Sequence, residues 1–189
     1  DILSALRDAG VDHFYLQYFQ APGVAEAELE QDVAASIRRM HYSASGDGPD
    51  TVTFGMLKTG KGILHNTVEP ETLPDWLSER DVEEYASEFR RTGFDGGLNW
   101  YRNIKRSSEL MAPWRGQVIH QPSLFIAGEA DDVLKFPNAQ ANIDNFSNTL
   151  PGMRGCHILP SAGHWIQRER ATAVNELLIE FLGGLKNAG

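Results

Sequence analysis

Two short apolar runs in the last third of the chain constrain its fold more than any other feature. The segments "QPSLFIAGEADD" (residues 121–132) and "RGCHILPSAGH" (residues 154–164) each pass through a short apolar stretch into glycine and ionisable residues. Each stretch is too short for a typical helix, and an apolar run of this length fits a buried strand. The sequence therefore predicts two buried strands whose carboxyl ends open into loops.

A helical pattern follows the second predicted strand. Its apolar residues share one helical face and are Val174, Leu177, Leu178, Phe181, Leu182 and Leu185. Such a face predicts a helix that lies on a sheet. Strand, helix, strand and helix from Pro122 onward indicate a parallel βαβα unit of the α/β class. Because two strands do not make a stable sheet, we expect this unit to end a larger doubly wound sheet.

The first two thirds of the chain have helical patterns instead. One apolar stripe predicts a helix over residues 25–40, and Ser78 is a good N-cap for a second helix that ends near Gly93. The residues expected to form the buried face of that second helix are Val82, Tyr85 and Phe89. Residues 43–74 are rich in Gly, Pro, Ser and Thr, which predicts a long surface segment.

Composition narrows the class of protein. The 189 residues are 41% apolar and 23% charged, as in globular proteins, and the net charge of −9 argues against a nucleic-acid partner. The single cysteine, Cys156, cannot form an internal disulfide, and the first residues do not resemble a signal peptide. No apolar run approaches the roughly 18 residues of a membrane helix. These features predict a cytoplasmic protein that binds no membrane.

The two predicted strands deliver the strongest candidates for chemistry. Asp131 follows the first strand and His164 follows the second, and in open parallel sheets reactive groups gather at these carboxyl ends. A carboxylate that accepts a hydrogen bond from imidazole fixes its tautomer and leaves the other nitrogen free as a base. By position alone, Asp132 or Glu129 could replace Asp131. Taken singly, each residue could also be a turn or packing residue.

The remaining candidates are weaker. The other histidines, expected at the surface or in packing, are His13, His41, His65, His120 and His157. No H-E-x-x-H or C-x-x-C spacing indicates a metal site, and no cofactor is expected. A nucleophile elbow G-x-Nu-x-G matches only "GFDGG" around Asp95, which follows a polar helix instead of a buried strand. We therefore expect no nucleophile in this chain.

Four segments carry a resemblance to a known family. They are "FYLQYFQAPGVAEAELEQD", "FRRTGFDGGLNWYRN", "PSLFIAGEADDVL" and "AGHWIQRERATAVNELLIEFL", and they closely resemble soluble epoxide hydrolases of the α/β-hydrolase fold, of the bacterial type. The resemblance implies a helical cap domain over residues 1–116 and the C-terminal portion of the hydrolase core over residues 117–189. The N-terminal half of the core, with the oxyanion loop and an Asp nucleophile, would be supplied in cis or as a second chain.

The resemblance also implies roles for individual residues. Asp131 would be the acid that orients His164, and His164 the base that activates water. Tyr15 and Tyr101 would be the two cap tyrosines that hydrogen-bond the epoxide oxygen as negative charge develops on it. Without the resemblance these tyrosines would be read as packing residues, and Tyr18 could be confused with Tyr15.

The same resemblance implies a substrate pocket and a reaction. Leu16, Val133 and Trp165 would contact a small-molecule epoxide, and Leu16 stands where mammalian relatives carry glutamine. The reaction would give a vicinal diol through an alkyl-enzyme ester, with no cofactor or metal, and the chain alone is expected to be inactive. Two alternatives remain open: a haloalkane or haloacid dehalogenase of the same fold, and a nonenzymatic cap or interaction fragment. A homodimer is possible.

Overall fold

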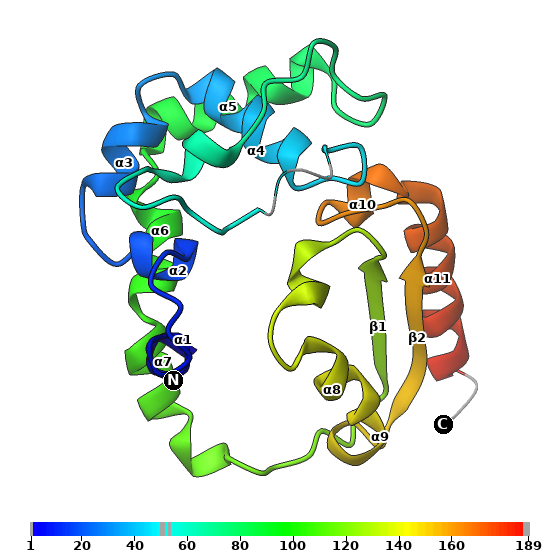
Figure 1. The fold of residues 1–189 in the computed structure, drawn as a ribbon. Coiled ribbons are helices and arrows are strands. Elements are labelled where there is room, and N and C mark those ends of the chain that lie inside the picture. The colour runs from blue at the N-terminus through cyan, green and yellow to red at the C-terminus, as the bar shows by residue number, and fades with distance from the viewer. Residues whose placement is uncertain (1, 50–51, 53, 187–189) are drawn as a thin grey trace. The chain divides into compact units, whose positions relative to one another are not determined.

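The computed structural model describes residues 2–49, 52 and 54–186, and its chain divides into two compact units. The helical unit holds residues 1–43 and 49–115, and the α/β unit holds residues 44–48 and 116–189. The short segment 44–48 thus belongs to the α/β unit, although helices of the other unit precede and follow it (Figure 1).

The helical unit is built around one apolar core. Its elements are α1 (Ile2–Asp8), α2 (Tyr15–Tyr18), α3 (Val24–Leu29), α4 (Val33–Ser43), η1 (Ile63–Asn66), α5 (Glu79–Thr92), α6 (Asp95–Arg102), α7 (Ile104–Leu110) and η2 (Ala112–Trp114). The buried residues of the core are Phe19, Ala25, Leu29, Val33, Ile37, Ile63, Leu77, Val82, Ala86, Phe94 and Leu98. Most of these side chains come from α3 to α6, so the core joins those helices.

The predicted helix over residues 25–40 is wrong in one respect, because the structure divides it into α3 and α4. Asp32 begins the second helix, since its Oδ1 accepts a hydrogen bond from the N–H of Ala35 at 3.0 Å. The hydroxyl of buried Ser36 donates to the carbonyl of Leu29 at 2.9 Å. The apolar stripe survives the break because both helices turn the same face toward the core.

The predicted start and end of α5 are confirmed. The Ser78 hydroxyl accepts from the N–H of Asp81 at 3.1 Å, and the Asp81 carboxylate accepts from the N–H of Ser78 at 2.9 Å. Gly93, at φ 69°, ends the helix. The predicted burial of Tyr85 is wrong: this residue is 38% exposed, and Ala86 is the one that is fully buried. The Tyr85 ring instead lies against His41, with ring centroids 5.2 Å apart.

The segment over residues 43–74 is more buried than its composition predicts. Ile63 is 2% exposed and joins the core of the helical unit. The Arg39 side chain of α4 donates to the Thr67 hydroxyl at 3.0 Å and to the carbonyls of Leu64 and Thr67 at 2.6 and 2.9 Å. One arginine therefore ties the described residues around η1 to α4.

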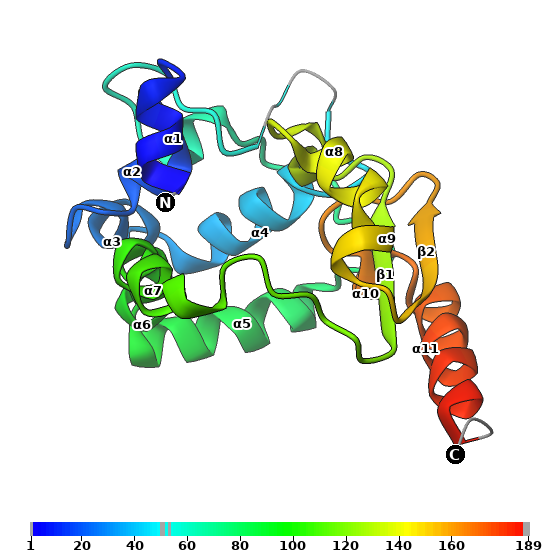
Figure 2. The same ribbon diagram turned by 90° about the horizontal axis from the view of Figure 1, so that it is seen from below.

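The α/β unit contains the predicted parallel strand pair, β1 (Ser123–Gly128) and β2 (Met153–Leu159). Register runs from Leu124 opposite Gly155 to Gly128 opposite Leu159. The other elements are η3 (Asp132–Lys135), α8 (Ala139–Asp144), α9 (Phe146–Thr149), α10 (Ile166–Glu169) and α11 (Ala171–Lys186). The strands lie between α8 and α9 on one side and α11 on the other (Figures 1 and 2). This is the expected layering of a βαβα unit.

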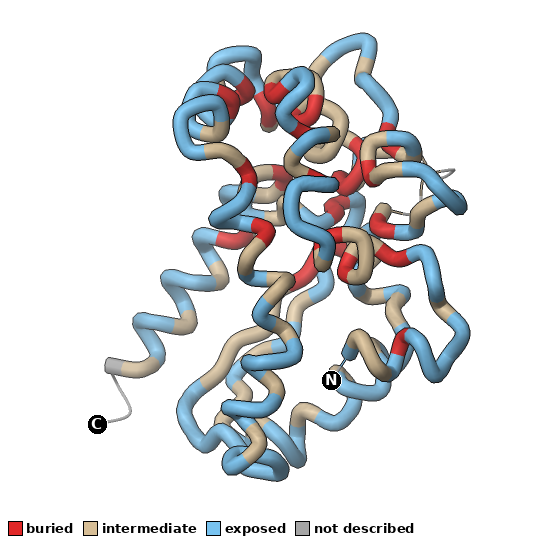
Figure 3. The backbone as a smooth tube through the Cα atoms, turned by 90° about the vertical axis from the view of Figure 1, so that its left-hand side faces the viewer, coloured by how far each residue is buried: buried red, intermediate tan, exposed pale blue. Residues whose placement is uncertain are grey.

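The α/β unit leaves apolar surface uncovered. Val174 of α11 is 7% exposed, but Leu178 and Leu182 of the same helix are 41% and 56% exposed, and Ile158 of β2 is 43% exposed. Figure 3 shows exposed and intermediate colours along most of the final helix. The prediction of two buried strands is therefore wrong for this chain: most of their residues are intermediate or exposed, because each strand of a two-stranded sheet has one edge without a neighbouring strand. Within residues 2–49, 52 and 54–186, no helix has the length and hydropathy to cross a membrane.

Candidate active site

Asp131 and His164 lie together at the carboxyl ends of β1 and β2. The Nδ1 atom of His164 is 3.2 Å from Oδ2 and 3.3 Å from Oδ1 of Asp131. The two residues meet because β1 and β2 are parallel neighbours, and each residue lies in the loop that follows its strand. With Nδ1 facing the carboxylate, Nε2 is the ring nitrogen that can accept a proton.

The Asp131 carboxylate is held in place from a second side. It is the N-cap of η3, and its Oδ1 accepts from the N–H of Val133 at 2.9 Å. Burial acts to raise the pKa of Asp131, but the hydrogen bonds from His164 and the Val133 N–H outweigh it and hold that pKa below the usual value. Asp131 is therefore a charged, fixed acceptor for the imidazole.

The neighbouring acids make different contacts. Asp132 forms an ion pair with Lys135, with Nζ 2.7 Å from Oδ1. Glu129 has an exposed side chain, and its N–H donates to the carbonyl of Leu159 at 2.9 Å. Among these three acids, the contact to His164 belongs to Asp131.

The protonated form of His164 is favoured by its surroundings. The hydrogen bond to Asp131 raises the pKa of His164, burial opposes this, and the charges of Asp131 and Glu169 add to the increase. The side chain is 45% exposed, so part of the ring remains accessible to solvent. The Trp165 ring meets it edge-on, with centroids 5.1 Å apart. Such an imidazole can take up a proton and be stabilised as it does so.

The loop that carries His164 is packed tightly against the segment 44–48, a contact that sequence reasoning missed. The N–H of His164 donates to the carbonyl of Ala44 at 2.9 Å. A Cβ atom on Gly163 would lie 2.5 Å from the carbonyl carbon of Ser45, so only glycine fits there. The run of small residues in "SASGDG" was the available signal, because close backbone approach needs small side chains.

Tyr15 and Tyr101 meet within the helical unit. Tyr15 begins α2, Tyr101 lies near the end of α6, and their rings pack edge to face with centroids 5.7 Å apart and an interplanar angle of 78°. The Gln20 amide donates to the carbonyls of Leu16 and Tyr101 at 2.8 and 3.0 Å, which ties α2 to α6. Burial raises the pKa of Tyr101, which keeps its phenol protonated and able to donate.

The hydroxyl group of Tyr18 is bound to a carboxylate. The Tyr18 hydroxyl donates to Oε2 of Glu28 at 2.7 Å, and burial, with this carboxylate, raises the pKa of Tyr18 strongly. Glu28 also accepts from the N–H groups of Ile63 and Leu64 at 2.9 and 3.0 Å. Tyr18 thus belongs to a structural network, whereas Tyr15 pairs with Tyr101.

Gly55 leaves room for the ring of Tyr15, a contact that sequence reasoning also missed. Its carbonyl accepts from the N–H of Tyr15 at 2.8 Å, and its φ is +91°. A Cβ atom at this position would lie 2.7 Å from Cδ1 of the Tyr15 ring. Glycine is therefore required both by the backbone conformation and by the ring.

The three residues predicted to contact substrate differ in exposure. Leu16 is 5% exposed, Val133 is 41% exposed, and Trp165 is intermediate. Their place in a pocket stays a prediction. Within the described parts of the chain, no group of three or more His, Cys, Asp or Glu residues could hold a metal ion.

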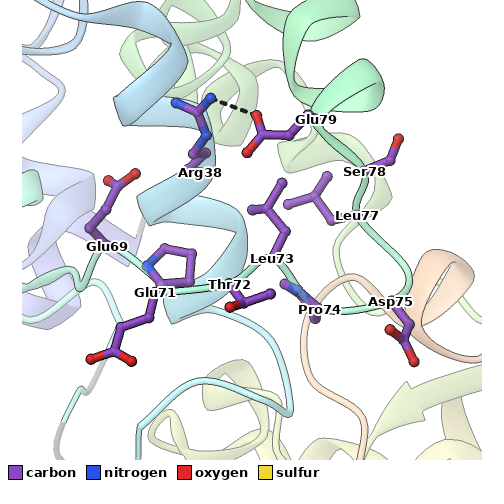
Figure 4. A pocket seen from close by; sticks show the side chains of 11 residues that line it. Arg38, Glu69, Glu71, Thr72, Leu73, Pro74, Asp75, Leu77, Ser78 and Glu79 are labelled. Carbon is purple, nitrogen blue, oxygen red and sulfur yellow. Dashed lines mark hydrogen bonds and ion pairs between the residues drawn. The ribbon is translucent and has the colours of Figure 1, made fainter.

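A hollow of about 500 Å³ lies elsewhere on the helical unit (Figure 4). Its wall includes Arg38 and four acids, Glu69, Glu71, Asp75 and Glu79. Arg38 forms an ion pair with Glu79 at 2.6 Å. None of the predicted catalytic residues lines this hollow. It is a polar surface feature and does not contribute to the site described above.

Known proteins are similar to this chain in both sequence and fold. Epoxide hydrolase A of Mycobacterium tuberculosis is 43% identical over 178 residues, which cover 94% of this chain and 54% of that protein. The chain resembles the epoxide hydrolases. Bifunctional epoxide hydrolase 2 of Mus musculus is 37% identical over 180 residues, which cover 95% of this chain and 31% of that protein. No family model matches the chain.

Solved epoxide hydrolases extend the likeness to the fold. The crystal structure of epoxide hydrolase A from Mycobacterium thermoresistibile is 42% identical, with a TM-score of 0.85 over 96% of this chain and 56% of that one. An epoxide hydrolase from an endophytic Streptomyces is 39% identical, with a TM-score of 0.91 over 97% of this chain and 56% of that one. The predicted fold, part of an α/β hydrolase with a helical region, is confirmed. The chain spans about half the length of the epoxide hydrolases with solved structures.

Proposed function

We propose that this chain is the helical cap and C-terminal core of a soluble epoxide hydrolase, in which His164 activates water under the control of Asp131. The observation that carries the proposal is the contact between His164 Nδ1 and the Asp131 carboxylate at the ends of two parallel strands. This pair leaves Nε2 as the base, and the raised pKa of His164 favours proton uptake from water.

The reaction has two steps. A carboxylate nucleophile outside these 189 residues attacks one epoxide carbon, the carbon–oxygen bond breaks, and a tyrosine hydroxyl protonates the alkoxide. Water then attacks the carbonyl carbon of the resulting ester while His164 takes its proton. The ester breaks to release the diol and restore the carboxylate, and the imidazolium proton returns to the tyrosinate through solvent.

The tyrosine pair favours an epoxide over a haloalkane as substrate. An opening epoxide leaves a strongly basic alkoxide that needs a proton, whereas a halide leaves as a stable anion. Tyr15 and Tyr101 are phenols from two helices held ring against ring, and the raised pKa of Tyr101 keeps it a donor. We assign both hydroxyls to the epoxide oxygen and place Leu16, Val133 and Trp165 around the rest of the substrate.

The nucleophile is assigned to the remaining part of the hydrolase sheet, in the same polypeptide or in a second chain. The apolar surface at Ile158, Leu178 and Leu182 supports this, because apolar patches of a folded unit usually mark a contact surface. We call the chain joined to this part the full-length protein. Without this remaining part of the sheet, the chain would be a folded but inactive fragment.

Turnover of paired substrates tests the proposal. The full-length protein is incubated with styrene oxide or with 1-chlorobutane, and diol and chloride are measured. We expect diol from the epoxide and no chloride above background. Chloride release without diol would identify a dehalogenase, and neither product would favour the nonenzymatic alternative.

A further inference from the structure

Glu169, which the reaction above does not use, is a buried acid at the end of α10. It is 8% exposed, although acids are rarely buried unless paired or hydrogen-bonded. Its Oε2 accepts from the N–H groups of Gly46 and Gly163, both at 2.8 Å, and its Oε1 accepts from the N–H of Trp165 at 3.0 Å. Three charge-assisted hydrogen bonds therefore hold this carboxylate in place.

These bonds surround His164. Gly163 and Trp165 are its two neighbours in the chain, and the N–H of His164 itself donates to the carbonyl of Ala44. Three consecutive N–H groups of the loop are thus fixed, the outer two by one carboxylate and the middle one by the segment 44–48. Through Gly46 the same carboxylate also binds that segment.

We propose that Glu169 is the positioning residue for His164: its carboxylate fixes the backbone on both sides of the imidazole and places a second negative charge, beside that of Asp131, near the base. The proposal rests on the proposed function. In the ester-hydrolysis step His164 gains a proton, and a nearby fixed negative charge stabilises the imidazolium. Glu169 acts through its hydrogen bonds to the backbone and through the electric field of its negative charge, and it does not touch substrate.

The charges around His164 define the expected pH effect. Asp131 approaches the imidazole from the loop after β1, and Glu169 acts from α10. Lys135 pairs with Asp132, Asp47 of segment 44–48 has an exposed side chain, and the Arg170 guanidinium donates to the carbonyls of Ser161 and Glu169. The charge of Glu169 adds to the increase in the pKa of His164, so its removal lowers that pKa.

Two variants of the full-length protein separate charge from shape. Glu169→Gln keeps the length of the side chain but removes the charge, and with either orientation of the amide at least one of the three N–H groups faces an NH₂ group. Glu169→Asp keeps the charge but shortens the side chain. Glu176→Gln, at an exposed position on α11, is the matched control. Ester formation and ester hydrolysis are measured by rapid quench and intact mass between pH 5 and pH 9.

We expect Glu169→Gln to form the ester at the wild-type rate but to hydrolyse it more slowly, by up to about a hundredfold, as a misplaced catalytic group does. Its hydrolysis needs neutral His164, so the acid limb of the pH profile moves to lower pH. Glu169→Asp also slows hydrolysis but keeps the limb in place, and Glu176→Gln changes neither.

The outcomes distinguish this inference from the proposed function. If the wild-type protein forms no ester, the proposed function fails, and the inference fails with it. If the wild type forms the ester and Glu169→Gln hydrolyses it at the normal rate with an unmoved limb, only the inference is overturned. Should Glu169→Gln not fold, Glu169→Asp decides: slowed hydrolysis with an unmoved limb supports the inference, and wild-type hydrolysis overturns it.

Discussion

The rings of Tyr15 and Tyr101 pack edge to face, with centroids 5.7 Å apart, although they come from helices distant in the sequence. Phe19 lies beside both, with centroid distances of 5.6 Å to Tyr15 and 5.0 Å to Tyr101. Aromatic packing of this kind fixes ring planes and hence the direction of both hydroxyls. The proposed function assigns the two hydroxyls of this fixed pair to one epoxide oxygen.

Removing either hydroxyl should slow the first step. In the full-length protein, Tyr15→Phe or Tyr101→Phe should reduce ester formation by about a hundredfold, the usual loss for one oxyanion donor, and the double variant should nearly abolish it. Tyr18→Phe is the matched control, because that hydroxyl is bound to Glu28. Single-turnover alkylation measures the effect, and an unaltered rate in the double variant would show that the rings only pack.

Gly55→Ala should disturb the same step indirectly. The change forces an L-residue to φ +91° and places a methyl group against the Tyr15 ring. Gly60→Ala is the control, since Gly60 has φ +69° but no atom within 4 Å of the added Cβ. Both variants should lose about 1–2 kcal/mol of unfolding free energy from the backbone alone. Only Gly55→Ala should also slow alkylation, and equal alkylation rates in the two variants would contradict this role.

Asp131→Asn should affect the second step and its pH dependence. Asp131 is the first cause of the raised pKa of His164, so the variant lowers that pKa. Because the neutral imidazole is the base, the acid limb of the pH–rate profile for ester hydrolysis should move to lower pH. The plateau rate should fall because the tautomer of the imidazole is no longer fixed.

The control for that experiment is Asp132→Asn. Asp132 pairs with Lys135, so this variant should leave both the limb and the plateau close to those of the wild type. If Asp132→Asn instead shifted the limb and lowered the plateau more than Asp131→Asn, Asp132 would be the residue that orients His164.

The sequence predicted the Asp131 and His164 contact because parallel neighbouring strands bring their carboxyl ends together whatever the details of the loops. Position after the strand alone could not choose among Glu129, Asp131 and Asp132, since that choice depends on which side chain caps η3; the family resemblance supplied Asp131. The parallel strand pair and the ends of α5 could also be predicted from the sequence, because proline, glycine and a capping serine are local signals.

Features that depend on distant contacts could not be predicted. The break between α3 and α4 depends on Asp32 as a helix cap within a continuous apolar stripe. The role of Glu169 was hidden because its partners are backbone N–H groups, one of them at Gly46. The resemblance pointed to Tyr15, but the hydrogen bond of the Tyr18 hydroxyl to Glu28 could not be predicted, because Glu28 lies on another helix.

The most direct test of the central claim is the intact mass of the full-length His164→Gln variant after exposure to styrene oxide, with His120→Gln as the control at an exposed histidine. If His164 is the base of the second step only, the His164 variant should gain the mass of one substrate per active site while diol release falls by orders of magnitude. The control should turn over normally and carry no added mass. Normal diol release by the His164 variant, or a folded variant that never gains the substrate mass, would contradict the two-step role of His164.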